Sequence, residues 1–224
     1  MLFRSIIEWA REYNFNLEGS TMMVQGFGNV GSNAAVILSK LGVSTIAVGD
    51  HTGYTFNPEG FNAHKLQDYV EAHGSIAGYP GGKAITREEF FSTKADIFAP
   101  CALENQIGEA EAKSLDVKLI AEGANGPCNP TGERLALEKG IDILPDVLAN
   151  AGGVTVSYYE WVQNKRSESW TEEEVDARLE KAMKRAYREV SDFARLKKVD
   201  RRIAAYALAL QRIEAVYKER EIFP

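Results

Sequence analysis

The sequence predicts an α/β protein with a doubly wound parallel sheet, followed by a C-terminal helical annex. Three observations predict this class. Short apolar runs alternate with helical patterns over residues 16–149, a glycine-rich turn joins the first run to a helix, and no strand pattern remains after Asn150. Parallel neighbours need a crossover connection, which is usually helical, so this alternation is typical of a parallel sheet.

The elements follow in order from the spacing of apolar residues. A leading helix is expected within residues 1–15, and strands at 21–24, 43–48, 96–98, 118–121 and 142–144. Helices are expected at 30–41, 61–72, 87–91, 107–115 and 134–139, and then at 153–165, 172–194 and 201–219. Thr86 with Glu89, and Thr171 with Glu174, match the capping box that starts a helix. We expect residues 16–149 to form the sheet domain and residues 150–224 to add helices to that same domain.

The composition is that of a folded globular protein. Of the 224 residues, 45% are hydrophobic and 26% are charged, and the formal net charge of −6 disfavours binding to nucleic acid or to an anionic membrane surface. No apolar stretch approaches the roughly eighteen residues of a membrane span. Cys101 and Cys128 lie in separate segments without metal-ligand spacing, so we expect neither a disulfide nor a metal site, and we expect a reducing, cytoplasmic location.

The glycine-rich turn fits the pattern G-x-G-x-x-G, as Gly26-Phe27-Gly28-Asn29-Val30-Gly31. It lies between a predicted strand and a predicted helix, which is the context that a Rossmann-type dinucleotide site requires. The first glycine permits a tight turn, the second lets backbone approach a diphosphate, and the third lets helix and strand pack closely. The alternative is an ordinary turn without a ligand.

An acidic residue stands where such a site needs one. Asp50 lies 19 residues after Gly31, at the end of the second predicted strand, where a carboxylate can accept hydrogen bonds from ribose hydroxyls. This placement favours NAD, with NADP possible, and includes the neighbouring His51 in the site. The alternative for Asp50 is a solvated residue at a strand end.

Three segments together resemble a known family. They are Val24-Gln25-Gly26-Phe27-Gly28-Asn29-Val30-Gly31, Ala121-Glu122-Gly123-Ala124-Asn125-Gly126-Pro127 and Leu148-Ala149-Asn150-Ala151-Gly152-Gly153-Val154. In order and spacing they resemble the glutamate/leucine/phenylalanine/valine dehydrogenase family, and the closing Ile222-Phe223-Pro224 resembles its C-terminal stretch. The resemblance implies oxidation of an amino acid to its 2-oxo acid and ammonia, with hydride transfer to NAD or NADP.

The resemblance also implies roles for individual residues. The diphosphate would lie at Gly26–Gly31 with Asn29 as a contact, the adenosine ribose near Asp50, and the nicotinamide riboside near Asn125 and Asn150. A carboxamide can donate and accept, which suits ribose hydroxyls and the nicotinamide amide. Without the resemblance, both asparagines are better explained as turn residues among glycine and alanine. Because the family uses acidic residues near Asp50 with either cofactor, NADP stays open.

The segment from Val154 to Trp161 resembles glutamate dehydrogenases more than their branched-chain or phenylalanine relatives. A Ser157 hydroxyl can hydrogen-bond a substrate carboxylate, and Val154, about one helical turn earlier, can pack against the substrate's methylenes. The alternatives are a surface role for Ser157, a leucine- or phenylalanine-type dehydrogenase, and a stand-alone dinucleotide-binding module without catalysis.

The resemblance places the family's catalytic lysine and aspartate in an N-terminal domain that this sequence does not contain. We therefore assign no catalytic residue, and we expect the chain alone to bind a dinucleotide without turning over L-glutamate or 2-oxoglutarate. Full-length relatives imply a homo-hexamer, whereas the chain alone is expected to be a monomer or a weak dimer.

Overall fold

The computed structural model describes residues 2–219, with side chains from residue 4 onward. Met1 and residues 220–224, including Ile222-Phe223-Pro224, lie outside the described range. The contacts within the chain divide it into two compact units, Met1–Asn150 and Ala151–Pro224. The expectation that the C-terminal helices belong to the same domain as the sheet stays a prediction.

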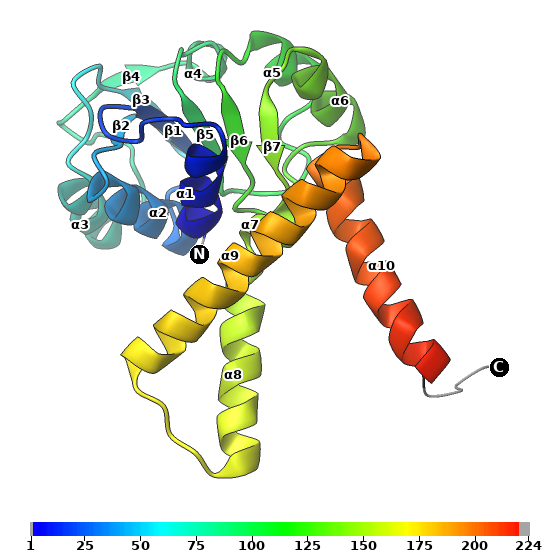
Figure 1. Ribbon diagram of the computed structural model, residues 1–224. Coiled ribbons are helices and arrows are strands. Elements are labelled where there is room, and N and C mark those ends of the chain that lie inside the picture. Colours follow the sequence, from blue (N-terminus) through cyan, green and yellow to red (C-terminus); the bar gives the residue numbers. More distant parts are fainter. Residues whose placement is uncertain (1, 220–224) are drawn as a thin grey trace. The chain divides into compact units, whose positions relative to one another are not determined.

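A seven-stranded sheet with the order β4-β3-β2-β1-β5-β6-β7 forms the centre of the first unit (Figure 1). Five of its strands are parallel neighbours, which confirms the predicted parallel sheet. They are β1 (Thr21–Gln25), β2 (Ser44–Asp50), β5 (Ile97–Pro100), β6 (Leu119–Ala121) and β7 (Asp142–Leu144).

Two antiparallel strands at one edge were not predicted from the sequence. β3 (Gly53–Phe56) pairs with β2 across a tight turn, and β4 (Lys83–Ile85) pairs with β3. They extend the predicted parallel sheet at this edge by two strands. The two strands have only four and three residues, which is too short for an apolar run or alternation to distinguish them from loops.

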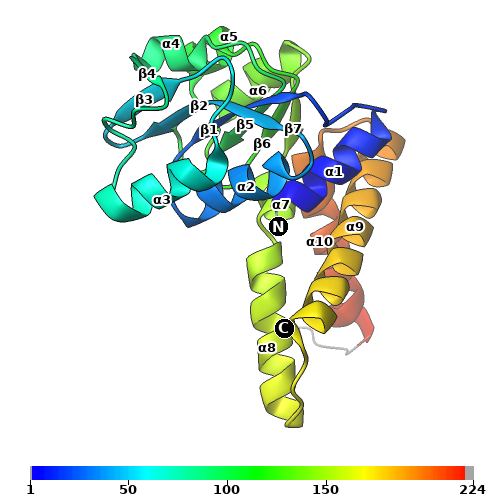
Figure 2. The same ribbon diagram turned by 90° about the vertical axis from the view of Figure 1, so that its left-hand side faces the viewer.

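Helices cover both faces of the sheet (Figure 2). One face carries α1 (Leu2–Glu12), α2 (Asn29–Ser39), α3 (Ala63–His73) and the short α7 (Asp146–Ala149), and the other carries α4 (Arg87–Phe91), α5 (Glu109–Ser114) and α6 (Pro130–Glu138). All of these except α7 were predicted, within a few residues at each end.

Apolar burial fixes this layering. Phe90 and Phe91 of α4 pack with Phe98 of β5 in the core beneath α4–α6, and all three are almost wholly buried. Helix α4 starts as its capping box predicts, because Thr86 accepts from the Glu89 amide (3.1 Å) and Glu89 accepts from the Thr86 amide (2.7 Å).

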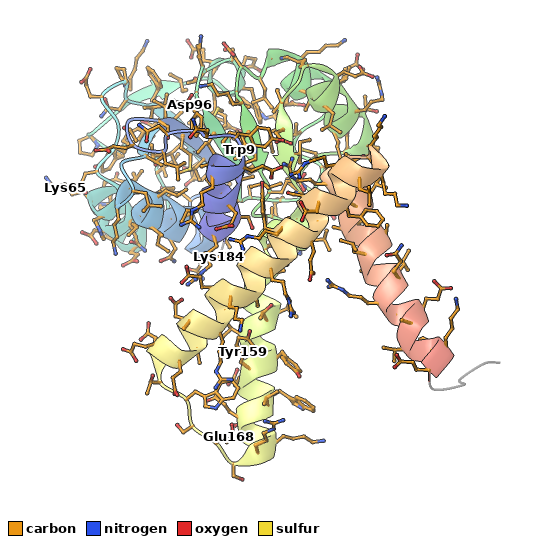
Figure 3. The ribbon with its side chains drawn as sticks, in the orientation of Figure 1. Trp9, Lys65, Asp96, Tyr159, Glu168 and Lys184 are labelled. Carbon is orange, nitrogen blue, oxygen red and sulfur yellow. The ribbon has the colours of Figure 1, made fainter. Side chains whose placement is uncertain are left out.

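Within residues 151–219 the second unit contains three helices, which confirms the three predicted ones; they are α8 (Gly152–Arg166), α9 (Glu172–Lys197) and α10 (Arg201–Glu219). The Thr171–Glu174 capping box starts α9. Tyr159 of α8 lies beside α9, where its hydroxyl donates to the Arg178 carbonyl at 3.3 Å (Figure 3). In residues 2–219 no helix has both the length and the apolar character that a membrane crossing needs.

Candidate functional site

A cavity of about 700 Å³ opens where the carboxyl ends of β1, β2 and β5 meet. β1 is hydrogen-bonded to β2 on one side and to β5 on the other. Strands β2 to β4 are therefore added on one side of β1 and strands β5 to β7 on the other, so the strand order reverses at β1. Ligands of doubly wound folds bind at such a reversal point. The walls are Gln25–Gly28, Asp50–Tyr54, Val70, Gly74, Cys101–Leu103 and Gln106.

Gly26 occupies a position that only glycine fits. Its φ is +88°, its amide donates to the Gly49 carbonyl at 2.6 Å, and a Cβ there would lie 2.6–2.7 Å from the backbone of Cys101 and Ala102. Positive φ and the close approach of the β5 loop both exclude a side chain. The turn therefore brings the ends of β1, β2 and β5 together.

Gly31 lets α2 pack directly on β1. A Cβ at this position would lie 2.0 Å from the Gly26 carbonyl oxygen and 2.9 Å from Cγ1 of Val24. This is the close helix–strand contact expected of the third glycine in the motif.

Gly28 differs from both, because it faces open space. It is the N-cap of α2 without a side-chain cap, and a Cβ there would meet no atom within 4 Å. Asn29 and Val30 follow it on the exposed first turn, whereas Phe27 is buried. Since the first amides of a helix lack intrahelical acceptors and α2 has no acidic residue in its first turn, an anion would be well placed here.

Asp50 has a structural task that sequence reasoning missed. Its Oδ1 accepts from the amide (2.6 Å) and hydroxyl (2.5 Å) of Thr52, and its Oδ2 accepts from the Ile76 amide (2.9 Å). The carboxylate thus ties the β2–β3 turn to the segment after α3. Two oxygens offer about four acceptor positions, so three internal bonds leave room for about one external donor. The His51 side chain beside it is exposed.

The structure brings Asn125 and Asn150 together. They lie on the loops after β6 and β7, and Nδ2 of Asn150 donates to Oδ1 of Asn125 at 2.6 Å. Neither is among the residues that line the 700 Å³ cavity, although all these loops follow carboxyl ends of parallel strands.

Val154 and Ser157 lie in the second unit, on α8. Both side chains are exposed, Val154 to 71%. Their spacing puts them on one helix face, as expected. Because both side chains are exposed, both are available for contact with a ligand.

Several cavity walls carried no signal in the sequence. Tyr54 belongs to the unpredicted β3, and Val70 and Leu103 are ordinary apolar residues of a helix and a loop. The sulfur of Cys101 packs beside Gly123, and burial raises the pKa of its thiol to about 12, although the residue as a whole is partly exposed. Across the described residues, no three His, Cys, Asp or Glu side chains gather as a metal site would require.

Known proteins resemble this chain over nearly its whole length. A glutamate dehydrogenase of Thermotoga maritima is 45% identical over 206 residues, which are 92% of this chain and 50% of that protein. An NAD-specific glutamate dehydrogenase of Staphylococcus aureus is 37% identical over 208 residues, again 50% of its length. The chain thus spans about half the length of these curated relatives.

Solved structures agree. The hetero-hexameric glutamate dehydrogenase of Thermus thermophilus superposes with a TM-score of 0.92 at 30% identity, over 100% of this chain and 53% of that one. The model of the Glutamate/Leucine/Phenylalanine/Valine dehydrogenase family matches residues 2–220. This chain therefore belongs to the glutamate/leucine/phenylalanine/valine dehydrogenase family.

Proposed function

We propose that the Met1–Asn150 unit binds a nicotinamide dinucleotide, with its diphosphate against Gly26–Gly31. The observation that carries the proposal is Gly28, an uncapped helix start with nothing within 4 Å of its missing Cβ, at the mouth of the cavity. The N-terminus of a helix carries about half a positive charge and unsatisfied amides, which suit a diphosphate. Phe27, Asn29 and Val30 complete the loop that would hold it.

The cavity beside Asp50 suits the adenosine half. Its volume of about 700 Å³ lies within the range of small-molecule sites. Asp50 retains about one acceptor position for a ribose hydroxyl, and His51 is exposed next to it. Asn125 and Asn150 would hold the nicotinamide end, and the nicotinamide ring of the bound cofactor supplies the hydride acceptor.

We infer a preference for NAD over NADP. A 2′-phosphate would place a second anion beside the Asp50 carboxylate, and among the cavity walls in the described chain there is no lysine or arginine to neutralise it. Like charges at close range repel, whereas a ribose hydroxyl can donate to the carboxylate.

For a full-length protein of this kind we propose oxidative deamination of L-glutamate to 2-oxoglutarate and ammonia. The support is the resemblance to glutamate dehydrogenases and the exposed pair Val154 and Ser157 on α8. The residues that transfer protons would come from the half of such a protein that lies outside this sequence. We expect that protein to act in the cytoplasm as a hexamer and the present chain to be a monomer or weak dimer. Large apolar side chains of α10 that are more than half exposed would favour association; they are Ile203, Tyr206, Leu210, Ile213 and Tyr217.

Calorimetric titration of the purified chain tests dinucleotide binding. NAD and NADH should bind with measurable heat, and NADP at least about tenfold more weakly, the equivalent of roughly 1.4 kcal/mol. Absence of heat and of thermal stabilisation with saturating NAD and NADP would refute the site. Equal affinities would refute the inferred preference alone.

Substrate choice is tested in a full-length enzyme that contains this chain. Ser157→Ala should lower kcat/KM for glutamate much more than for leucine, because it removes a donor to the side-chain carboxylate. Thr155→Val is the matched control, since the Thr155 hydroxyl donates to the Ala151 carbonyl (2.8 Å) within its own helix. Undiminished glutamate turnover in Ser157→Ala would contradict the assignment.

A further inference from the structure

A wholly buried carboxylate lies next to the predicted nicotinamide end of the site. Glu122 directly follows β6 and is 0% exposed, and its Oε2 accepts from the Asp146 amide at 2.8 Å. A buried charge is unfavourable unless it is well compensated by partners, so a carboxylate here indicates a positional demand that an apolar residue could not meet.

Asp146 makes a second hydrogen bond between the same two segments, in which it is the acceptor and not the donor. It is the first residue of α7, and its Oδ2 accepts from the Gly126 amide at 2.8 Å. Glu122 therefore holds the loop after β7, and Asp146 holds the loop after β6. The two bonds cross-link the loops in both directions.

These loops carry the two asparagines. Asn125 precedes Gly126, and Asn150 is the C-cap of α7, the helix that Asp146 begins. Their mutual bond of 2.6 Å uses one acceptor of Asn125 and one donor of Asn150. It leaves the Asn125 amide nitrogen as a donor and the Asn150 oxygen as an acceptor. Flipping both amides gives the same set of one donor and one acceptor.

A primary carboxamide has the complementary pair, one carbonyl acceptor and one NH₂ donor. We propose that Glu122 and Asp146 are positioning residues, which hold the Asn125–Asn150 pair in the orientation that binds the carboxamide of a nicotinamide ring. The inference rests on the proposed dinucleotide site and deepens it. It assigns a task to two carboxylates that are not among the cavity walls.

The test compares NADH with ADP-ribose, which lacks the nicotinamide. Glu122→Gln keeps the size of the side chain but removes its charge and one acceptor oxygen. In the 224-residue chain this variant should bind NADH about five- to tenfold more weakly, because the hydrogen bond from the Asp146 amide that orients the loop is weakened. Its affinity for ADP-ribose should stay within about twofold. The fluorescence change of the reduced nicotinamide on binding should also decrease. Asp146→Asn should give the same pattern and serves if Glu122→Gln does not fold.

Asp96→Asn is the matched control. Asp96 also joins two segments, since it accepts from the Thr21 amide (2.9 Å) and from Lys118 (2.8 Å), but it precedes β5 at the amino edge of the sheet (Figure 3). This variant should lose stability and yet bind both ligands like the parent.

The outcomes are distinct. Selective loss of NADH affinity in Glu122→Gln or Asp146→Asn, absent from Asp96→Asn, supports the inference. Equal weakening of NADH and ADP-ribose, or unchanged binding of both, overturns it and leaves the dinucleotide site standing. A parent chain that binds neither ligand overturns the proposed function as well.

Discussion

Gly28→Ala and Gly31→Ala separate ligand binding from stability within one loop. At Gly28 an added Cβ meets no protein atom within 4 Å, whereas at Gly31 it lies 2.0 Å from the Gly26 carbonyl oxygen. The same chemical change should therefore impair binding at the first position and folding at the second.

The magnitudes follow from these contacts. Gly28→Ala should lower the free energy of unfolding by at most about 1 kcal/mol, the difference between glycine and alanine as an N-cap. Gly31→Ala should lower it by about 2–3 kcal/mol, since backbone must move to relieve the overlap. If the Cβ at position 28 takes space that a diphosphate needs, an overpacking penalty of about 1–3 kcal/mol converts to a roughly five- to 150-fold weaker Kd for NADH.

Urea unfolding gives the first quantity, and titration of NADH fluorescence gives the second. A Gly28→Ala chain that binds NADH like the parent would show that the diphosphate does not lie against this loop. A Gly31→Ala chain as stable as the parent would contradict the close packing of α2 on β1.

Three further predictions concern single side chains. Asp50→Asn should lower the free energy of unfolding, measured in urea, by about 1–2 kcal/mol, because it removes the charge from three hydrogen bonds. Calorimetry should also show that the affinity of this variant for NADP is closer to its affinity for NAD. The pKa of Asp96 is lowered from 3.8, because burial acts to raise it but the Lys118 ammonium and the Thr21 donors outweigh burial. The contribution of the Asp96 carboxylate to the free energy of unfolding is therefore complete above pH 3.8 and is lost as the pH falls through the pKa of the folded state. Asp96→Asn should be less stable than the parent chain by about 0.5–1 kcal/mol at pH 7, and as stable as the parent in strong acid. Burial raises the pKa of the Cys101 thiol to about 12, so iodoacetamide at pH 8 should label it slowly in the folded chain and readily in urea, as mass spectrometry can measure.

Each of these has a contrary result. Unchanged cofactor discrimination in Asp50→Asn would remove the carboxylate from the choice between NAD and NADP. An Asp96→Asn deficit that persists in strong acid would contradict the assigned pKa direction. Fast labelling of Cys101 in the native chain would show that its sulfur is accessible.

Features with a local physical cause could be predicted from the sequence. The glycine loop, the capping boxes and the parallel strands rest on neighbouring residues, and these elements are present in the structure. The β3–β4 edge could not be predicted, because strands of four and three residues acquire their identity only by pairing, β3 with β2 and β4 with β3.

Contacts between distant segments were also beyond the sequence. The bond from the Ile76 amide to Asp50 spans 26 residues, and the Asn150–Asn125 bond spans 25. The second depends on the parallel pairing of β6 with β7, which brings the two loops to one edge. Motif spacing predicted a role for Asp50, and the family resemblance predicted roles for both asparagines, but neither indicated which contacts hold these side chains in place.

The internal bonds of Asp50 bear on how coenzyme use could be altered in such a chain. One carboxylate fastens the β2–β3 turn and the segment at Ile76, and under the proposed function the same group meets the sugar. Replacing it to admit a phosphorylated sugar would loosen two loops at once. Position 51, whose histidine side chain is exposed, allows a new positive charge without that penalty. Redesign for NADP is therefore best begun with His51→Arg while Asp50 is retained.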